Sequence, residues 1–335
     1  MSLTDVISHT LGILPGLRRT PLPTAIDAPV SVVPSRAGDL FVYESALSRG
    51  APVVLIHSIN AAASSYEMRP LFEALQVSRP VIALDLPGFG LSERVNRRYD
   101  REFFRTAIEA VLERARDRHG IPADVVALSL GCELAALATL DRPELVRSLT
   151  MISPTGFNLP KADSASERVH LSERLLGILG APLYAVLSSR VSIDHYLGKS
   201  FEGAVDRGLA RYDWLTAHQP GARFAPLAFL SGKLFDTHVR QRIYEKLERP
   251  VHVIYDTDPY TTFATLHTAA DYRAWTVTRV SPTRGMPHFE RPDRTLQAME
   301  TFWGSLDAPH VRNGSGEAHK PFKFDDSHGG GARGR

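Results

Sequence analysis

One serine in this chain stands where a nucleophile could stand. Ser129 follows residues 124–128, an apolar run that predicts a short buried strand, and it precedes residues 130–140, whose Ala and Leu content predicts a helix. On such a sharp strand-to-helix turn the hydroxyl is exposed beside the first free N–H groups of the helix. Ala127 and Gly131 are small, as the close approach of strand and helix requires. The pattern indicates acyl-transfer chemistry, and an ordinary helix N-cap serine is the alternative.

A histidine and two aspartates follow much later in the chain. His288 lies in a loop before a C-terminal helical stretch, and residues 251–255 predict a strand that leads into Asp256 and Asp258. A serine hydroxyl needs a base within hydrogen-bond reach, and the base needs an acceptor that fixes its tautomer. The residues leave both aspartates open as that acceptor. Either one could instead form a turn, and His288 could be a buried structural histidine.

Two further runs complete a recognisable set. Residues 80–92 read PVIALDLPGFGLS, a strand followed by a Gly/Pro turn, and residues 284–292 read RGMPHFERP. Together with the strand at residues 52–57 and the Ser129 turn, these motifs in this order resemble the α/β-hydrolase fold superfamily, especially its capped single-domain serine hydrolases. The resemblance covers about residues 40–306. It implies an α/β fold, with a mostly parallel sheet of about eight strands, helices on both faces and an inserted helical cap, and it implies no cofactor.

The resemblance also implies roles for the triad. Ser129 would be the nucleophile and His288 the base. Asp258 would be the acid because it precedes Pro259, as the family's acid commonly does, with Asp256 as the alternative acid. The expected activity is that of a serine esterase, which cleaves a carboxylic ester or related acyl substrate through an acyl-enzyme intermediate.

The loop after residue 57 is the second part of the expected site. The N–H groups of Leu130 and Ile59 would form the oxyanion hole. His57, Ser58 and Asn60 are candidate pocket residues, although His57 is better explained as a brace for the loop. No pattern of Cys, His or acidic residues predicts a metal site.

Two departures from the family pattern keep other functions open. Ser58 stands where Gly is usual, and Ala127 replaces the commoner first Gly of the turn. The alternatives are a catalytically weak or inactive hydrolase-fold protein that binds an apolar ligand or partner, and a carbon–carbon bond hydrolase or lyase on the same fold.

Strand and helix patterns divide the chain into five parts. Residues 1–36, rich in Pro and small residues, predict an N-terminal arm. Residues 37–154 and 249–306 alternate between strand and helix patterns and form the expected core. Residues 155–248 show only helical patterns, over 171–179, 183–191, 195–201 and 235–247, and predict the cap. Residues 307–335 predict a disordered tail.

The predicted cap carries many apolar residues at close spacing. This density predicts an enclosed apolar acyl pocket above Ser129, and scaffold packing or a dimer face are the alternatives. The residues are Leu175, Leu176, Ile178, Leu179, Leu183, Val186 and Leu187.

Composition limits the class of protein. The chain has 335 residues, 43% of them hydrophobic, with a net charge of +2, so it has material for a large core and no strong field for nucleic acid. One cysteine, no basic segment before an apolar one, and no run of transmembrane length predict a cytoplasmic protein. The expected partner is a small apolar acyl substrate, and a homo-oligomer stays open.

Overall fold

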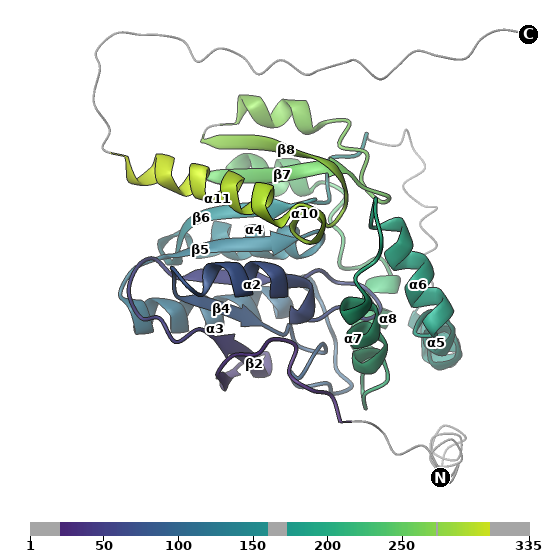
Figure 1. The fold of residues 1–335 in the computed structure, drawn as a ribbon. Coiled ribbons are helices and arrows are strands. Elements are labelled where there is room, and N and C mark those ends of the chain that lie inside the picture. The colour runs from purple at the N-terminus through teal and green to yellow at the C-terminus, as the bar shows by residue number, and fades with distance from the viewer. Residues whose placement is uncertain (1–20, 160–172, 273, 309–335) are drawn as a thin grey trace, which may run out of the picture.

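The computed structural model describes residues 21–159, 173–272 and 274–308. An eight-stranded sheet in the order β1-β2-β4-β3-β5-β6-β7-β8 runs through the centre (Figure 1). The first two strands pair antiparallel at one edge, and the other six are mutually parallel. The strands are β1 (Val30–Ser35), β2 (Gly38–Glu44), β3 (Val53–Ile56), β4 (Val81–Leu84), β5 (Ala123–Leu128), β6 (Val146–Ile152), β7 (Val251–Thr257) and β8 (Trp275–Arg284).

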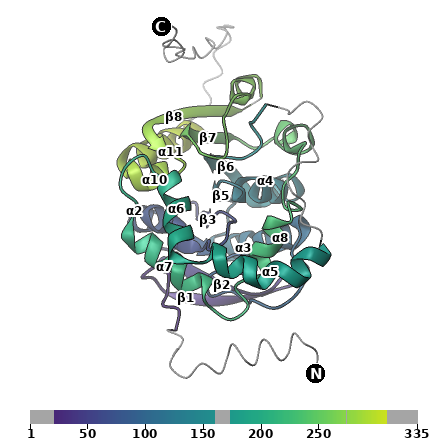
Figure 2. The same ribbon diagram turned by 90° about the vertical axis from the view of Figure 1, so that its right-hand side faces the viewer.

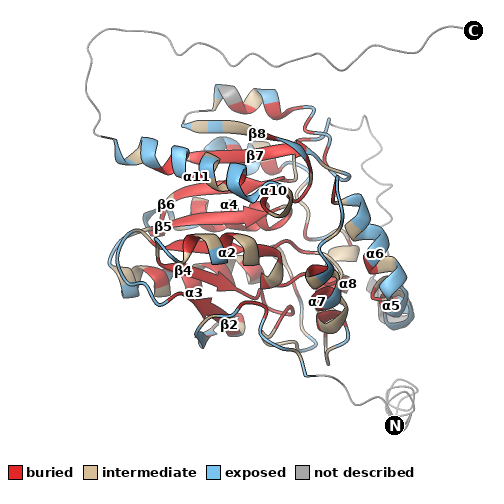
Figure 3. Cartoon of the chain, in the orientation of Figure 1, coloured by how far each residue is buried: buried red, intermediate tan, exposed pale blue. Residues whose placement is uncertain are grey.

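Helices cover both faces of the sheet, as the α/β pattern predicted (Figure 2). On one face lie α2 (Arg69–Leu75), α10 (Pro287–Glu290) and α11 (Pro292–Asp307), and on the other lie α3 (Arg101–His119) and α4 (Gly131–Asp141). Alternate side chains of the central strand β5 therefore enter two different cores: Val125 and Ala127 pack in one, Val126 and Leu128 in the other. Burial on both sides explains why β3 and β4 consist entirely of apolar residues and why Asp124 alone interrupts the apolar run of β5 (Figure 3).

A helical insert separates β6 from β7 and confirms the predicted insertion between core strands. It lies along one edge of the sheet (Figures 1 and 2). Its helices are α5 (Glu173–Leu187), α6 (Arg190–Lys199), α7 (Arg207–Ala217), α8 (Phe224–Leu230) and α9 (Val239–Arg242), with a 3-10 turn, η3 (Tyr244–Lys246). The predicted helix over 171–179 and most of the one over 183–191 are joined in α5, which continues through Pro182. The sequence patterns missed α7 and α8.

The insert is tied to the core by buried polar bonds. The Arg94 guanidinium donates to the carbonyl and the hydroxyl of Thr216 on α7, each at 2.7 Å, and also to the Gly90 carbonyl in the turn after β4. The Tyr184 hydroxyl of α5 lies 3.1 Å from the carbonyl oxygens of Ala61 and Ala217. The cap and the turns at the sheet edge therefore form one packed unit.

The apolar residues expected to line a pocket from α5 are divided. Leu179 is 47% exposed and Val186 is 66% exposed, so these two face away from any enclosed cavity. Leu183 and Leu187 are partly buried. The side chains of Leu175, Leu176 and Ile178 lie outside the described residues, as do residues 1–20 of the expected arm and 309–335 of the expected tail.

One strand lies inside the segment predicted as an arm. β1 pairs with β2 through a tight turn at Gly38, whose φ is +92°. Pro34 in β1 suggested an irregular arm, but an edge strand tolerates proline because its outer N–H groups need no partner strand. The sheet therefore begins earlier in the chain than its alternating pattern indicated.

The start of β5 depends on a buried carboxylate. Asp124 is fully buried and accepts hydrogen bonds from Ser148, from Arg79 and, at 2.6 and 2.9 Å, from Arg147.

Replacing Asp124 with Ala leaves two inward-facing guanidinium groups without their shared partner. We expect Asp124→Ala to lower the free energy of unfolding by about 3 kcal/mol, measured by urea denaturation. Glu113→Ala, which breaks the exposed pair with Arg142, should cost under about 1 kcal/mol; equal losses in the two variants would contradict this account.

Candidate active site

Ser129 lies on a strained turn, as its flanks predicted. Its φ is +52°, a left-handed value that non-glycine residues seldom adopt. The turn is held on both sides: the Ser129 N–H donates to the Ile152 carbonyl of β6 at 2.9 Å, and the Ser129 carbonyl accepts from the Cys132 N–H at 3.0 Å. Ser129 is only partly buried although Leu128 and Leu130 on either side are buried. This backbone holds a hydroxyl at the carboxyl end of the central strand.

Gly131 allows the turn to touch the loop after β3. A Cβ atom at Gly131 would lie 2.4 Å from the carbonyl oxygen of His57, closer than real Cβ contacts allow. A small residue is therefore needed two positions after Ser129 because the backbone of the loop after β3 lies directly against it. The same contact brings the loop after β3 alongside the start of α4.

Two backbone donors at this junction are unused. Among the described residues, neither the Leu130 N–H nor the Ile59 N–H donates a hydrogen bond. The first belongs to the residue after Ser129, and the second belongs to the loop that Gly131 contacts. Free N–H groups in this arrangement suit an oxyanion, as the sequence resemblance implied.

A buried glutamate that the sequence interpretation missed shapes this loop. Glu67, 3% exposed, accepts from the Ser58 N–H at 2.8 Å, from the Ser58 hydroxyl at 2.9 Å and from Asn60 Nδ2 at 2.8 Å. Ser58 and Asn60 thus belong to a network that fixes the loop. The available signal was one acidic residue in the otherwise apolar and small-residue start of the helix at 65–75.

His57 is a brace and not a pocket residue. It is fully buried, its Nδ1 lies 2.6 Å from the Ser58 carbonyl, and its Nε2 accepts from the Leu86 N–H at 2.9 Å. These partners require a proton on Nδ1 and a lone pair on Nε2. Burial lowers the pKa of His57, so the ring stays neutral and ties β3 to the turn after β4.

The two candidate acids have different surroundings. Both oxygens of Asp256 are engaged: Oδ1 accepts from Arg279 Nε at 2.7 Å and Oδ2 from the Thr283 N–H at 2.8 Å. These bonds attach β7 to β8. Among the described residues, Asp258 accepts through Oδ1 alone, from the N–H groups of Tyr260 and Thr261, both at 2.7 Å. Of the two, Asp258 is the one with a carboxylate oxygen left for another group.

His288 is not in hydrogen-bond contact with either expected partner. Its ring is fully buried, and Nε2 lies 2.7 Å from the backbone carbonyl of Glu67, so Nε2 carries the proton. Nδ1 has no hydrogen-bond partner in the described part of the chain. Burial lowers the pKa of His288 to about 4, although the bond to Glu67 acts in the opposite direction. Its assignment as the base stays a prediction, and these contacts give it no support.

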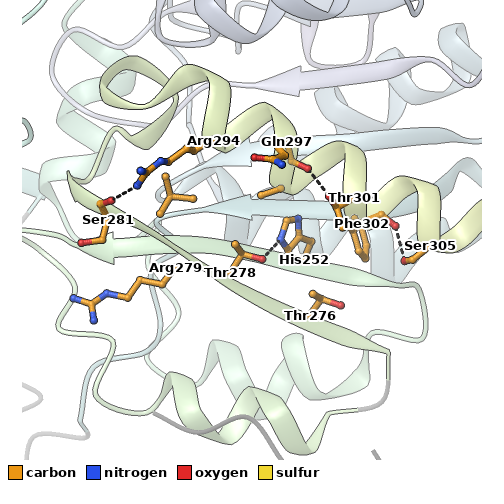
Figure 4. A pocket seen from close by; sticks show the side chains of 12 residues that line it. His252, Thr276, Thr278, Arg279, Ser281, Arg294, Gln297, Thr301, Phe302 and Ser305 are labelled. Carbon is orange, nitrogen blue, oxygen red and sulfur yellow. Dashed lines mark hydrogen bonds between the residues drawn. The ribbon is translucent and has the colours of Figure 1, made fainter. Parts of the chain in front are cut away.

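A large cavity lies away from this site. It has a volume of about 800 Å³ and lies between β8 and α11, lined by His252, Thr278, Arg294 and Phe302 among others (Figure 4). It includes neither Ser129 nor Asp258. Among its lining residues, His252 Nε2 lies 2.9 Å from the Thr278 hydroxyl and the His252 ring packs against Phe302.

The described ranges also limit other chemistry. Within residues 21–159, 173–272 and 274–308, no group of three or more His, Cys, Asp or Glu side chains could hold a metal ion. In the same ranges no helix combines the length and apolar content that crossing a membrane requires.

The fold is that of an α/β protein with a mostly parallel sheet, a helical insert and a serine on the strained turn after its central strand. The chain belongs to the Alpha/beta hydrolase family, whose sequence model matches residues 53–298.

Individual relatives agree on the family and differ in activity. The chain is similar to a mouse (Lyso)-N-acylphosphatidylethanolamine lipase, 30% identical over 35% of this chain and 34% of the relative. It is also similar to a 2-hydroxymuconate semialdehyde hydrolase of Pseudomonas sp. (strain CF600), 31% identical over 33% of this chain and 39% of the relative. The aligned segments therefore cover only about a third of the length of each of these two relatives. An esterase structure from Thermogutta terrifontis shares the fold at 14% identity, with a TM-score of 0.64 over 84% of this chain and all of that one.

The Gly131 contact yields a direct test. Gly131→Ala places a methyl group against the His57 carbonyl, so the loop after β3 must move. We expect a loss of about 1–3 kcal/mol in the free energy of unfolding, as for other overpacked sites, measured by urea denaturation. Gly198→Ala in α6 is the control, because nothing lies within 4 Å of its Cβ position. An unchanged stability of Gly131→Ala would contradict the close contact.

Asp258 yields a pH-dependent test. Burial raises its pKa to about 6, and the two N–H groups on Oδ1 oppose this. The unfolded carboxyl titrates near 3.9, so the folded protein holds the proton more tightly. The stability that this proton contributes is complete below about pH 4 and is lost as pH rises through about 6.

Asp258→Asn keeps the acceptor for both N–H groups and removes the ionisation. We expect its melting temperature to rise relative to the original protein between pH 4 and pH 7, measured by thermal unfolding at several pH values. Asp256→Asn should instead lose stability at pH 7, because it breaks the pair with Arg279. If the difference in melting temperature between Asp258→Asn and the original protein stayed constant with pH, it would contradict the raised pKa of Asp258.

Proposed function

We propose that this chain transfers acyl groups from a carboxylic ester or related acyl compound to water through Ser129. One observation carries the proposal: the Ser129 hydroxyl lies on a strained turn beside two unused N–H groups, those of Leu130 and Ile59. A tetrahedral intermediate on Ser129 would place its oxyanion where both groups can donate.

Membership of the hydrolase family supports the reaction class, and the names of the relatives extend from a lipase to a carbon–carbon bond hydrolase. Substrate choice in such folds depends on the parts that cover the site. Here a cap tied to the core supports a small or medium apolar acyl compound over a polymer. No step of this chemistry requires a cofactor.

The turnover we propose is slow. In the described structure no imidazole is hydrogen-bonded to Ser129, so nothing there removes its proton as it attacks. Sites of this class that lack one triad member keep roughly 10³–10⁴-fold catalysis over water, from the oxyanion hole and binding alone. The activity we propose is therefore intermediate between that of a full esterase and that of a protein that only binds its ligand.

A fluorophosphonate probe tests the proposal. We expect slow covalent labelling of the folded protein on Ser129, located by peptide mass spectrometry, and none in Ser129→Ala. Ser153→Ala is a matched control. Ser153 also follows a central strand, has φ +45° and donates its N–H to the next strand, and its buried hydroxyl has no partner in the described part of the chain. Labelling that persists in Ser129→Ala, or complete resistance to the probe, would remove the basis of the proposal.

A further inference from the structure

The loops that follow β7 and β8 meet at the sheet edge where Ser129 lies. Thr257 pairs with Arg284 in the register of these parallel strands, and the Gly285 N–H donates to the Thr257 carbonyl at 2.8 Å. Asp258 and Gly285, the next residue of each loop, are therefore neighbours. Both follow the carboxyl ends of their strands, as Ser129 follows the end of β5.

The free oxygen of Asp258 faces the position of Gly285. A Cβ atom at Gly285 would lie 3.1 Å from Asp258 Oδ2 and 3.5 Å from the Ser200 carbonyl at the end of α6. Among the described residues Asp258 Oδ2 accepts no hydrogen bond, whereas Oδ1 accepts two. A carboxylate oxygen is thus directed at a residue that has no side chain, below the cap.

The distance to Ser129 suits a group that bridges the two. Strand β6 alone separates β5 from β7, so the strand ends that carry Ser129 and Asp258 are two strand spacings apart, about 10 Å. A serine nucleophile needs a base that donates one N–H to an acceptor and receives the serine proton at another nitrogen. The structure holds the two outer members of that arrangement and no side chain at Gly285.

We infer that position 285 is the general-base position of this site, left unfilled by glycine, and that an imidazole placed there would activate Ser129. The inference rests on the proposed acyl-transfer function. His288, three residues further on, holds the chain instead: its Nε2 proton is committed to the Glu67 carbonyl. The desolvated state of Asp258, with its raised pKa, agrees with a carboxylate that lacks its cationic partner.

With an imidazole at position 285, Ser129 would attack the acyl carbon with base assistance. The unprotonated nitrogen of the imidazole takes the proton from Ser129 Oγ while Oγ bonds to the acyl carbon, and Asp258 accepts the N–H at the other nitrogen. The oxyanion receives the N–H groups of Leu130 and Ile59. The bond to the leaving oxygen then breaks, and the imidazolium returns its proton to that oxygen. Water repeats the sequence on the acyl-enzyme and releases the carboxylic acid and free Ser129.

Gly285→His in the full chain is the main test. We expect the second-order rate of fluorophosphonate labelling, and the hydrolysis of p-nitrophenyl butyrate, to rise by about 10²–10⁴-fold, the usual contribution of a positioned base. Gly285→Asn is the matched control, because Asn tolerates the φ of +75° at this position but supplies no base. Adding Asp258→Asn to Gly285→His should remove most of the gain, as an imidazole without its acceptor is poorly oriented.

Free imidazole tests the original protein without any change in folding. We expect added imidazole to accelerate labelling of Ser129 in a saturable way, with Ser129→Ala as the blank for uncatalysed ester hydrolysis. Gly285→His should respond little, because its site is filled. Absence of both the imidazole response and the Gly285→His gain, with labelling that His288→Gln abolishes, would overturn the inference and identify His288 as the base. No labelling of Ser129 in any protein or condition would instead defeat the proposed function itself.

Discussion

The contact between Gly131 and the His57 carbonyl is the constraint on which the arrangement of the site depends. It sets the distance between the turn that carries Ser129 and the loop that carries Ile59, and it admits no side chain between them. Because each partner is fixed by its own strand, β5 or β3, the parallel pairing of these strands is transmitted directly to the site. The relative position of the Leu130 and Ile59 N–H groups therefore depends first on this strand pairing.

Glu67 extends this order across the site. The Glu67 carboxylate accepts hydrogen bonds from Ser58 and Asn60 and so holds the loop after β3. The Glu67 backbone carbonyl accepts the N–H of His288 Nε2. The serine at position 58, a departure from the family pattern, is thus compatible with an ordered loop because its hydroxyl has a buried acceptor. The loop after β3 is therefore ordered by buried hydrogen bonds, and the contact that Ser129 lacks among the described residues is one to an imidazole.

The sequence predicted the parts of the fold that repeat a strong pattern. The strands predicted at 52–57, 124–128 and 251–255 and the helix predicted at 130–140 correspond to β3, β5, β7 and α4, because their apolar residues face one or both cores. The strained turn at Ser129 followed from small residues on both sides of a serine. By contrast, α7 and α8 were missed, because the helical pattern runs through the whole insert and does not separate its individual helices.

A sequence motif could not show which residue of the loop after β8 faces Asp258. His288 and Gly285 stand three residues apart in one short loop, and only the three-dimensional path shows which of them faces Asp258. Glycine leaves no chemical signal in a search for catalytic side chains, so its meaning came from the atoms around it. The family resemblance favoured Asp258 over Asp256, and the structure adds a difference in their partners: Arg279 and Thr283 hold Asp256, whereas one oxygen of Asp258 accepts no hydrogen bond among the described residues.

The bonds from Arg94 and Tyr184 have a kinetic consequence. They attach α5 and α7 to the turns at the sheet edge, so the cap cannot swing away as a whole without breaking several buried polar bonds together. A compound bound between these helices and Ser129 would therefore exchange by local rearrangement and not by movement of the whole insert. Because the insert stays attached to the core, selection among ligands would depend on how fast each one passes the insert as well as on its affinity.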